Sequence, residues 1–185
     1  KRKCSDMELA RRAKEAGMAG FVIKNHYMDT AGRAAVLQEL CPELKIAGGI
    51  TLNRSVGGLN PQAVEKMARM GGKMVWFPTL ESLEYQKFRN PGKTAEELPE
   101  GLLTVFGQNG ELKKEVYEIL KLCSEYDLAV GTGHMAAKEG LAVIAAGKAA
   151  GVKRMIVTHA DNPADAYTVE QQKEAVSMGA FIEHC

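Results

Sequence analysis

Short apolar runs alternate with longer amphipathic stretches along this chain. The runs are centred near residues 23, 48, 76, 130, 156 and 182 and are rich in β-branched and aromatic residues. Within the first three and within the last three, neighbouring runs are about 26 residues apart, the length of one strand, one helix and two loops. Continuous apolar runs of this kind are typical of strands buried in a parallel sheet. The pattern therefore predicts repeated βα units.

The stretches between the runs carry signals for the start and the end of helices. Ser5-Asp-Met-Glu8 and Thr168-Val-Glu-Gln171 are capping boxes, and the helices that they begin are expected to end at Gly17 and Gly179. Asn60-Pro61 supplies a capping side chain followed by a proline at the first helical position. These signals predict one helix before the first apolar run and further helices after the runs near residues 48 and 156.

Repeated βα units are compatible with an open doubly wound sheet or with a closed (β/α)8 barrel. The chain has no G-x-G-x-x-G or phosphate-loop pattern, which an open nucleotide-binding sheet usually has after its first strand. Polar residues follow many successive runs, and in a barrel all strand ends converge on one mouth. We therefore expect a single α/β domain over residues 1–185, a TIM-barrel-like (β/α)8 fold that is incomplete because six runs do not close a barrel.

Residues 80–110 interrupt the repeat. A turn signal, Arg89-Asn-Pro-Gly92, precedes the apolar run Leu102-Leu-Thr-Val-Phe106 and the turn sequence Gly107-Gln-Asn-Gly110. Because Asn-Gly favours tight turns, we expect a small hairpin near 102–110, inserted between two βα units. The alternative is that the apolar run is a seventh barrel strand.

All four histidines lie at the same kind of place, the last residue or two of an apolar run. They are His26, His134, His159 and His184. The carboxyl ends of parallel strands are where α/β folds build their sites, and imidazole is the commonest neutral nitrogen ligand of a catalytic metal. We therefore expect the histidines to cluster at one end of the sheet. This distribution indicates an enzyme, and a metal-dependent one.

His134 and His159 occupy matching positions on adjacent expected strands. Neighbouring strands lie ~4.8 Å apart, so the two side chains can share a divalent ion, expected to be zinc, with manganese or iron as alternatives. Asp161 is placed to orient the ring of His159. The alternative for each histidine is a hydrogen-bonded, buried side chain. Because most catalytic zinc sites have three protein ligands, we expect this chain to bind metal weakly or incompletely.

Further polar residues at strand ends are candidates for catalysis. Lys24 and His26 face the same side of their strand, and a lysine inside a barrel is costly unless it meets an anion or is carboxylated. The alternative is that Lys24 reaches water. Glu183 and His184 are adjacent and point to opposite faces, and we expect His184 to serve the mouth. The catalytic candidates are therefore His26, His184 and Lys24, with Glu183 in support.

Asn53 and Thr79 follow the second and third apolar runs. Their short polar side chains stand at strand ends, so we expect them to hydrogen-bond a substrate.

Composition narrows the classes of partner. The formal net charge of +1 gives no electrostatic case for nucleic acid or an anionic membrane. No apolar stretch approaches the ~20 residues that cross a bilayer. The four cysteines have no CxxC or clustered spacing, which fits a reducing compartment. We expect a cytoplasmic protein that acts on a small-molecule substrate without nucleic-acid or membrane partners; a homo-oligomer remains open.

The motifs at the strand ends, taken in order, resemble a family of cytosolic, amidohydrolase-like proteins. That family is a branch of the metal-dependent hydrolases built on distorted (β/α)8 barrels, and the match extends over almost the whole chain. The motifs are Ile23-Lys-Asn-His26, Gly48-Gly-Ile-Thr-Leu-Asn53, Val75-Trp-Phe-Pro-Thr79, Thr132-Gly-His134, Val157-Thr-His159 and Ile182-Glu-His184.

The resemblance implies that His134 and His159 occupy the metal-ligand positions of the fifth and sixth barrel strands. The metal ligands of that wider group also include a His-x-His pair on the first strand and an aspartate on the last strand. This chain departs from that pattern, because it contains no His-x-His pair and no such aspartate after Cys185. The resemblance therefore implies only part of the usual ligand set. We expect the native protein to extend beyond both termini, or to cover its outer strands around Val22 and Phe181 by association with a partner.

Three functions are compatible with these residues. The first is a metal-dependent hydrolase acting on an amide, cyclic amide or ester bond, in which His26 or His184 moves protons and Lys24 binds an acidic group of the substrate. The second is a metal-independent barrel lyase or aldolase that uses Lys24 as a Schiff-base nucleophile. The third is a non-catalytic barrel that binds a small molecule.

Overall fold

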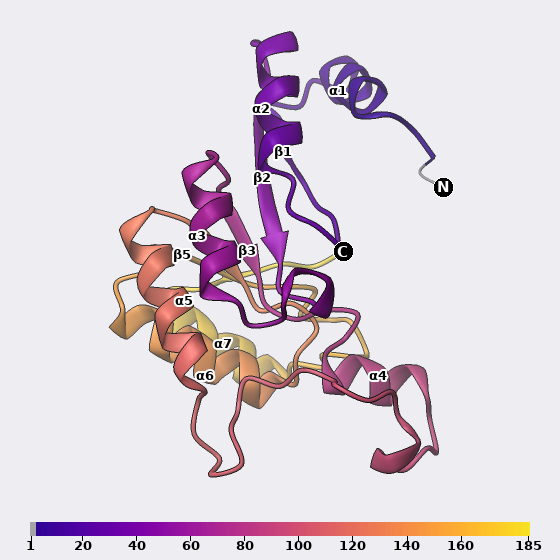
Figure 1. The fold of residues 1–185 in the computed structure, drawn as a ribbon, viewed down its shortest axis with the longest axis vertical. Helices are drawn as coiled ribbons and strands as arrows, with labels where there is room; N and C mark the ends of the chain where they lie inside the picture. The colour runs from indigo at the N-terminus through magenta and orange to yellow at the C-terminus, as the bar shows by residue number, and fades with distance from the viewer. Residues whose placement is uncertain (1–2) are drawn as a thin grey trace.

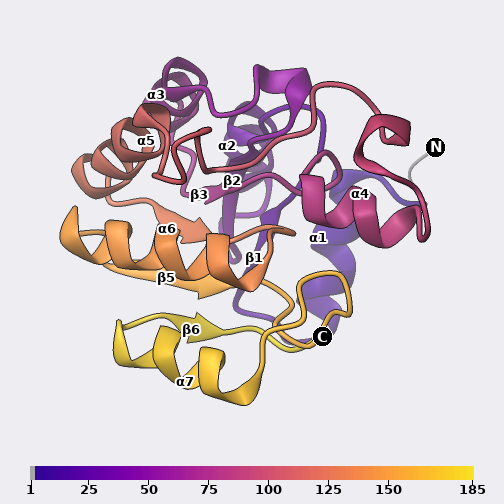
Figure 2. The same cartoon turned by 90° about the horizontal axis from the view of Figure 1, so that it is seen from below.

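The computed structural model describes residues 3–185, and its central element is one sheet of six parallel strands. The strands follow one another across the sheet in chain order, β1-β2-β3-β4-β5-β6. They lie where the apolar runs predicted them, and Figure 2 shows them as a curved row with helices along the outside. The strands are β1 (Gly20–Ile23), β2 (Lys45–Thr51), β3 (Met74–Trp76), β4 (Ala129–Gly131), β5 (Arg154–Val157) and β6 (Phe181–Ile182).

A helix follows each of the first five strands, as parallel pairing requires. The predicted caps are present: the Ser5 side chain accepts from the Glu8 amide, and Thr168 and Gln171 form a reciprocal capping box. The helices are α1 (Asp6–Glu15), α2 (Ala31–Leu40), α3 (Pro61–Arg69), α4 (Leu83–Arg89), α5 (Lys114–Glu125), α6 (Ala137–Ala149) and α7 (Val169–Ser177), with short 3₁₀ turns at Arg54–Val56 and Ala95–Glu97.

The sheet is curled into a half-barrel. Val22 of β1 and Glu183, directly after β6, line the same cavity, although they come from opposite ends of the strand order. This curl brings the carboxyl ends of all six strands toward one another, as the (β/α)-repeat predicted. Within the described residues β1 and β6 do not pair, so the sheet has two open edges. Val22 and Phe181 are exposed there.

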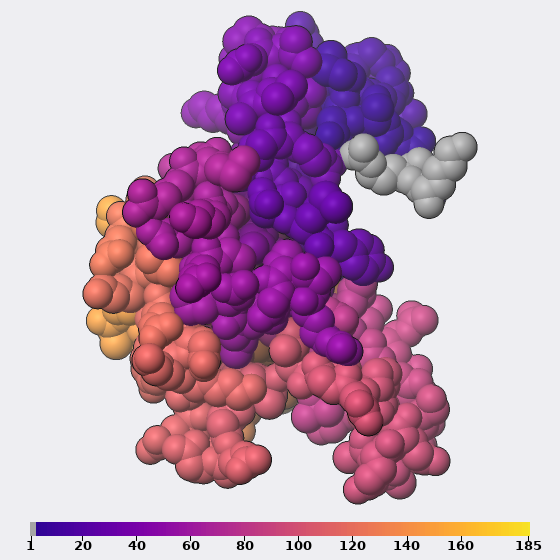
Figure 3. Space-filling model, in the orientation of Figure 1, coloured from indigo at the N-terminus to yellow at the C-terminus, as the bar shows by residue number. Residues whose placement is uncertain are grey.

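The hydrophobic core has two parts. The larger lies between the sheet and helices α3, α5 and α6, and includes the fully buried Val64, Ile119 and Ile144. The smaller joins α1 and α2 to the first two strands through residues such as Ala10 and Leu37. Figures 1 and 3 show this second part at the top of the molecule, beyond the rest of the sheet. The continuous strand β2 connects the two parts.

The segment 80–110 differs from the expected hairpin. Its turn is present, since the Gly107 amide donates to the Glu111 carbonyl at 2.8 Å, but only single bridges form, Phe106 with Leu112 and Ser82 with Leu103. No seventh strand is inserted either, because β3 pairs directly with β4. The reason is local burial: the fully buried Val105 belongs to the core.

Two further features hold this segment outside the sheet. The Val105 amide donates to the Glu139 carboxylate of α6, which satisfies a backbone donor that a strand partner would otherwise take. The segment also contains α4, which the hydrophobic pattern did not predict, and Figure 1 shows this helix at the lower edge of the molecule. No helix within residues 3–185 combines the length and apolar character needed to span a bilayer.

We predict that Gly133→Ala destabilises the fold more than Gly17→Ala. Both glycines have left-handed backbones, with φ of 67° and 70°. A Cβ at Gly133 would lie 2.3 Å from the Phe77 carbonyl oxygen, whereas a Cβ at Gly17 has open space. Both variants lose about 1–2 kcal/mol from the left-handed backbone, and overpacking at Gly133 costs about 1–3 kcal/mol more. Urea denaturation measures both, and equal losses would contradict the prediction.

Candidate functional site

Three of the four histidines meet at the carboxyl end of the sheet. The ring of His134, after β4, lies 6.4 Å from that of His26, after β1, and 5.6 Å from that of His159, after β5. Tyr85 of α4 packs against the same ring at 5.0 Å. The predicted cluster is therefore confirmed for these three side chains. The ring of His184, after β6, faces Asp161 instead, at 3.6 Å between Nδ1 and Oδ1.

His134 lies at the centre of this cluster. Its backbone amide donates to the Pro78 carbonyl at 2.9 Å, which anchors it to the end of β3. The residue is 8% exposed, and within residues 3–185 neither ring nitrogen has a hydrogen-bond partner. Burial, reinforced by the nearby Lys24, lowers the pKa of His134 to about 4. The ring is therefore neutral, and neutral imidazole is the form that ligates a metal.

His26 is held by a buried polar network. Its Nδ1 lies 2.8 Å from Thr79 Oγ1, and Asn53 Nδ2 donates to the same hydroxyl and to the His26 carbonyl. The Thr79 amide donates to Asn53 Oδ1 at 3.0 Å. Burial, followed by the charge of Lys24, lowers the pKa of His26. The network therefore fixes a histidine that is neutral near pH 7.

This network adds to the role expected for Asn53 and Thr79. Both side chains are at most 1% exposed. Their hydrogen-bonding atoms are occupied by His26 and by each other, because the curl brings the ends of β1, β2 and β3 together. They position His26, a role that the sequence did not predict, and contact with a substrate stays a prediction.

His159 has a different neighbour from the one expected. Its Nδ1 lies 3.2 Å from Glu183 Oε2 and 3.0 Å from Cys185 Sγ, while Asp161 pairs with His184. The expectation that Asp161 orients His159 is therefore wrong. The reason is the backbone: φ of His159 is 50°, so the chain turns there and Asp161 does not continue the alternation of the strand.

Glu183, and not the expected His184, faces the cavity at the end of the last strand. Glu183 lines the cavity on the concave face, whereas the side chain of His184 is 57% exposed and outside that lining. The two do point to different sides, as adjacent strand residues must. Register decides which side is inward: the Glu183 amide donates to the Val157 carbonyl, and this continues the β5–β6 ladder by one residue.

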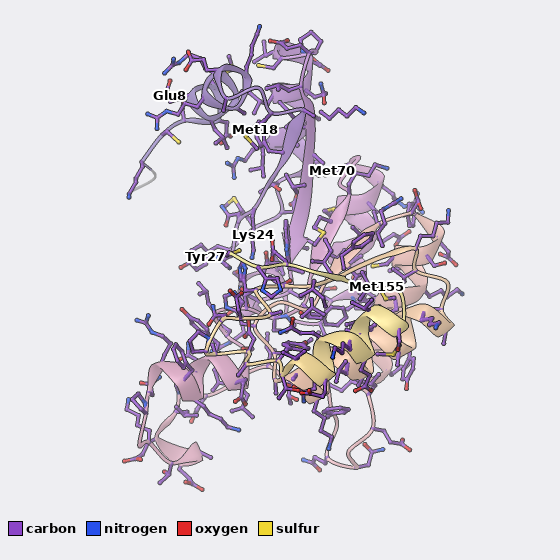
Figure 4. The ribbon with its side chains drawn as sticks, turned by 180° about the vertical axis from the view of Figure 1, so that it is seen from behind. Glu8, Met18, Lys24, Tyr27, Met70 and Met155 are labelled. Atoms are coloured by element: carbon purple, nitrogen blue, oxygen red, sulfur yellow. The ribbon has the colours of Figure 1, made fainter. Side chains whose placement is uncertain are left out.

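Lys24 lies on the concave face, as the alternation along its strand predicted. It lines a cavity of about 310 Å³ together with Trp76, His159 and Glu183, and its Nζ lies 5.1 Å above the Trp76 ring. Burial lowers the pKa of Lys24, against the opposing charges of Glu183, Asp165 and Cys185. Figure 4 shows Lys24 beside the C-terminal segment that follows β6.

Sequence reasoning missed three groups near the site. Tyr85 packs on His134 from a helix that was not expected. Asp165 is 3% exposed, and neither carboxyl oxygen has a hydrogen-bond partner among the described residues. Burial raises its pKa to about 8 despite the charge of Lys24. No motif surrounds Asp165 in the sequence, so no local signal marks it. The spacing of the cysteines indicates only a reducing compartment, and it does not reveal that Cys185 lies beside His159.

Comparison with known proteins finds a match to a family model. The model of a family described as a family of unknown function (DUF6282) matches residues 1–183. No curated protein matches the chain.

We predict that Asp165→Asn removes a pH dependence of stability. The folded pKa of about 8 lies above the ordinary value of 3.8. The proton bound in the folded state therefore stabilises it below about pH 4, and this contribution is lost as the pH rises through about 8. Relative to Asp165→Asn, the wild-type free energy of unfolding should fall between about pH 5 and about pH 8. Urea denaturation at the two pH values measures the free energy of unfolding of both proteins. Equal changes in wild type and Asp165→Asn would refute the raised pKa of Asp165.

Proposed function

The chain belongs to the family of unknown function DUF6282, and we propose that it is a metal-dependent hydrolase acting on an amide, cyclic amide or ester bond of a small molecule. One observation carries this proposal: the buried His134 has two unpartnered ring nitrogens next to His159. The resemblance of the strand-end motifs to amidohydrolase-like proteins supports it. On this proposal the half-barrel sheet is part of a (β/α)8 barrel.

His134 and His159 fit a divalent ion. A buried polar atom without a partner is costly, and native proteins rarely keep one without a reason. Both rings come from adjacent strands, with centroids 5.6 Å apart. Nitrogen donors suit zinc first, with manganese and iron as alternatives. When bound, a divalent ion supplies Lewis acidity, which activates water and polarises a substrate carbonyl.

His26 is the residue that we assign to proton transfer. Its Nδ1 is engaged by Thr79 Oγ1, so Nε2 is the ring atom left to accept or donate a proton at the site. The buried Asn53 holds the same hydroxyl, which limits rotation of the ring. A neutral histidine with a lowered pKa begins the reaction as a base.

Lys24 binds the substrate in this proposal. Its amine lines the concave cavity, where it can meet a carboxylate or another acidic group of a small molecule. The Trp76 ring below it offers an apolar surface for the rest of the substrate. His184 receives no role in the chemistry, because its side chain lies outside the cavity lining.

We predict that His134→Ala lowers hydrolysis by more than about 100-fold, since loss of a ligand exceeds the 10–100-fold cost of losing its supporting hydrogen bonds. A panel of amides, cyclic amides and esters is assayed with zinc, manganese or iron and with a chelator. Glu118→Gln on the exposed face of α5 is the control and keeps wild-type rates. Hydrolysis that survives both the chelator and His134→Ala refutes the metal-dependent proposal; no hydrolysis of any panel member favours a binding role.

A second candidate function is a lyase or aldolase that uses Lys24, and the observation that favours it is burial of the amine. Because its pKa is lowered, more of Lys24 is the neutral nucleophile at a given pH. The amine and a carbonyl substrate would form an imine and release water.

We predict for this second function that borohydride reduction with aldehyde or ketone substrates adds the carbon skeleton to Lys24, detected by peptide mass. Lys24→Arg should not be modified, and Lys138→Arg, on α6, should be modified like the wild type. An unmodified wild-type chain removes the imine mechanism.

A further inference from the structure

We propose that His159, Glu183 and Cys185 form a second divalent-cation site, with zinc as its preferred ion. Their donor atoms are His159 Nδ1, a Glu183 carboxylate oxygen and Cys185 Sγ, and all of them lie within 4.8 Å of one another. Within residues 3–185, these three side chains are the metal-binding residue types whose donor atoms lie close enough together to share one ion. The site differs from the pair of histidines discussed above, because it shares His159 with that pair but does not include His134.

The spacing of the donors matches tetrahedral zinc. Zinc bonds of about 2.0 Å to nitrogen or oxygen and about 2.3 Å to sulfur place neighbouring ligands about 3.3–3.6 Å apart. His159 Nδ1 lies 3.0 Å from Cys185 Sγ and 3.2 Å from Glu183 Oε2. Both separations are shorter than these values, so the side chains must move apart by up to about half an ångström to admit the ion.

The chemistry of the three donors selects zinc. Thiolate and imidazole favour zinc over magnesium or calcium, which prefer oxygen ligands. The thiolate and the carboxylate contribute two negative charges, which neutralise a divalent ion. Binding also replaces the close approach of Cys185 and Glu183 to one ring nitrogen with bonds to a cation.

The site is open on one side. His159 and Cys185 line a cavity of about 330 Å³ together with Asp161, Asn162 and Pro163. Cys185 is exposed, so an ion can enter from solvent. Three protein donors leave a fourth position for water or a small ligand, which is the arrangement of catalytic zinc sites.

The two metal proposals share His159 but use different atoms of it. Nδ1 faces Glu183 and Cys185, and the pair with His134 would use Nε2. A neutral imidazole carries a proton on one ring nitrogen, so the ring ligates one ion at a time unless that proton is released to solvent. Binding of an ion at His159, Glu183 and Cys185 therefore does not require the proposed hydrolase function.

Cobalt(II) titration of the 185-residue chain tests the site, because a thiolate bound to cobalt gives a charge-transfer band in the near ultraviolet. The wild type should show this band, and zinc should abolish it by displacement. Cys185→Ser should lose the band and bind zinc at least about tenfold more weakly in calorimetry. Glu183→Gln should keep the band with weaker binding. Cys4→Ser, which changes another solvent-accessible cysteine, is the matched control and should behave as the wild type.

Circular dichroism establishes that each variant is folded, which the exposure of Cys185 favours. Absence of the band in the wild type overturns the proposal, and so does a band that survives Cys185→Ser. His134→Ala should leave the band intact; its loss there would show that the thiolate-bound ion needs His134 and would overturn the assignment. A chain that shows the band but hydrolyses nothing retains this site and loses the proposed hydrolase function.

Discussion

Parallel pairing of six strands in chain order is the constraint on which the rest of this structure depends. Each connection must return to the starting end of the sheet, so the helices lie on one face and the carboxyl ends collect at one edge. The accumulated twist curls the sheet until the first and last strands line a common cavity. His26, His134 and His159 meet because they end strands that this pairing brings together.

The polar groups at that edge fall into two kinds. Asn53, Thr79 and His26 satisfy one another in a buried network, which fixes the position of an imidazole. His134 and Asp165 are buried with no partner for their polar atoms. A satisfied network stabilises a geometry, whereas unsatisfied buried groups cost free energy and are candidate positions for a ligand. The candidate site thus combines a hydrogen-bonded network around His26 with two buried side chains, His134 and Asp165, whose polar atoms have no partner among the described residues.

The position of Glu183 links the two metal proposals to the fold. The β5–β6 ladder continues through its backbone, so its carboxylate turns toward the concave face and reaches the His159 ring. Lys24 lies across the same cavity. The carboxylate of Glu183 therefore shares this cavity with the partly buried Lys24 amine and the His159 ring, and this arrangement suits either a cation or a polar substrate.

The sequence by itself determined the six strands, the capped helices that it marked and the histidines at the strand ends. Periodicity and capping are local properties, set by side chains within a few residues of one another. Only the tertiary structure decided that Asn53 and Thr79 hold His26, that Glu183 instead of Asp161 meets His159, and that segment 80–110 packs as a loop with a helix. These outcomes depend on register, curl and the left-handed turn at His159, which join residues far apart in the chain, and no local pattern encodes such distances.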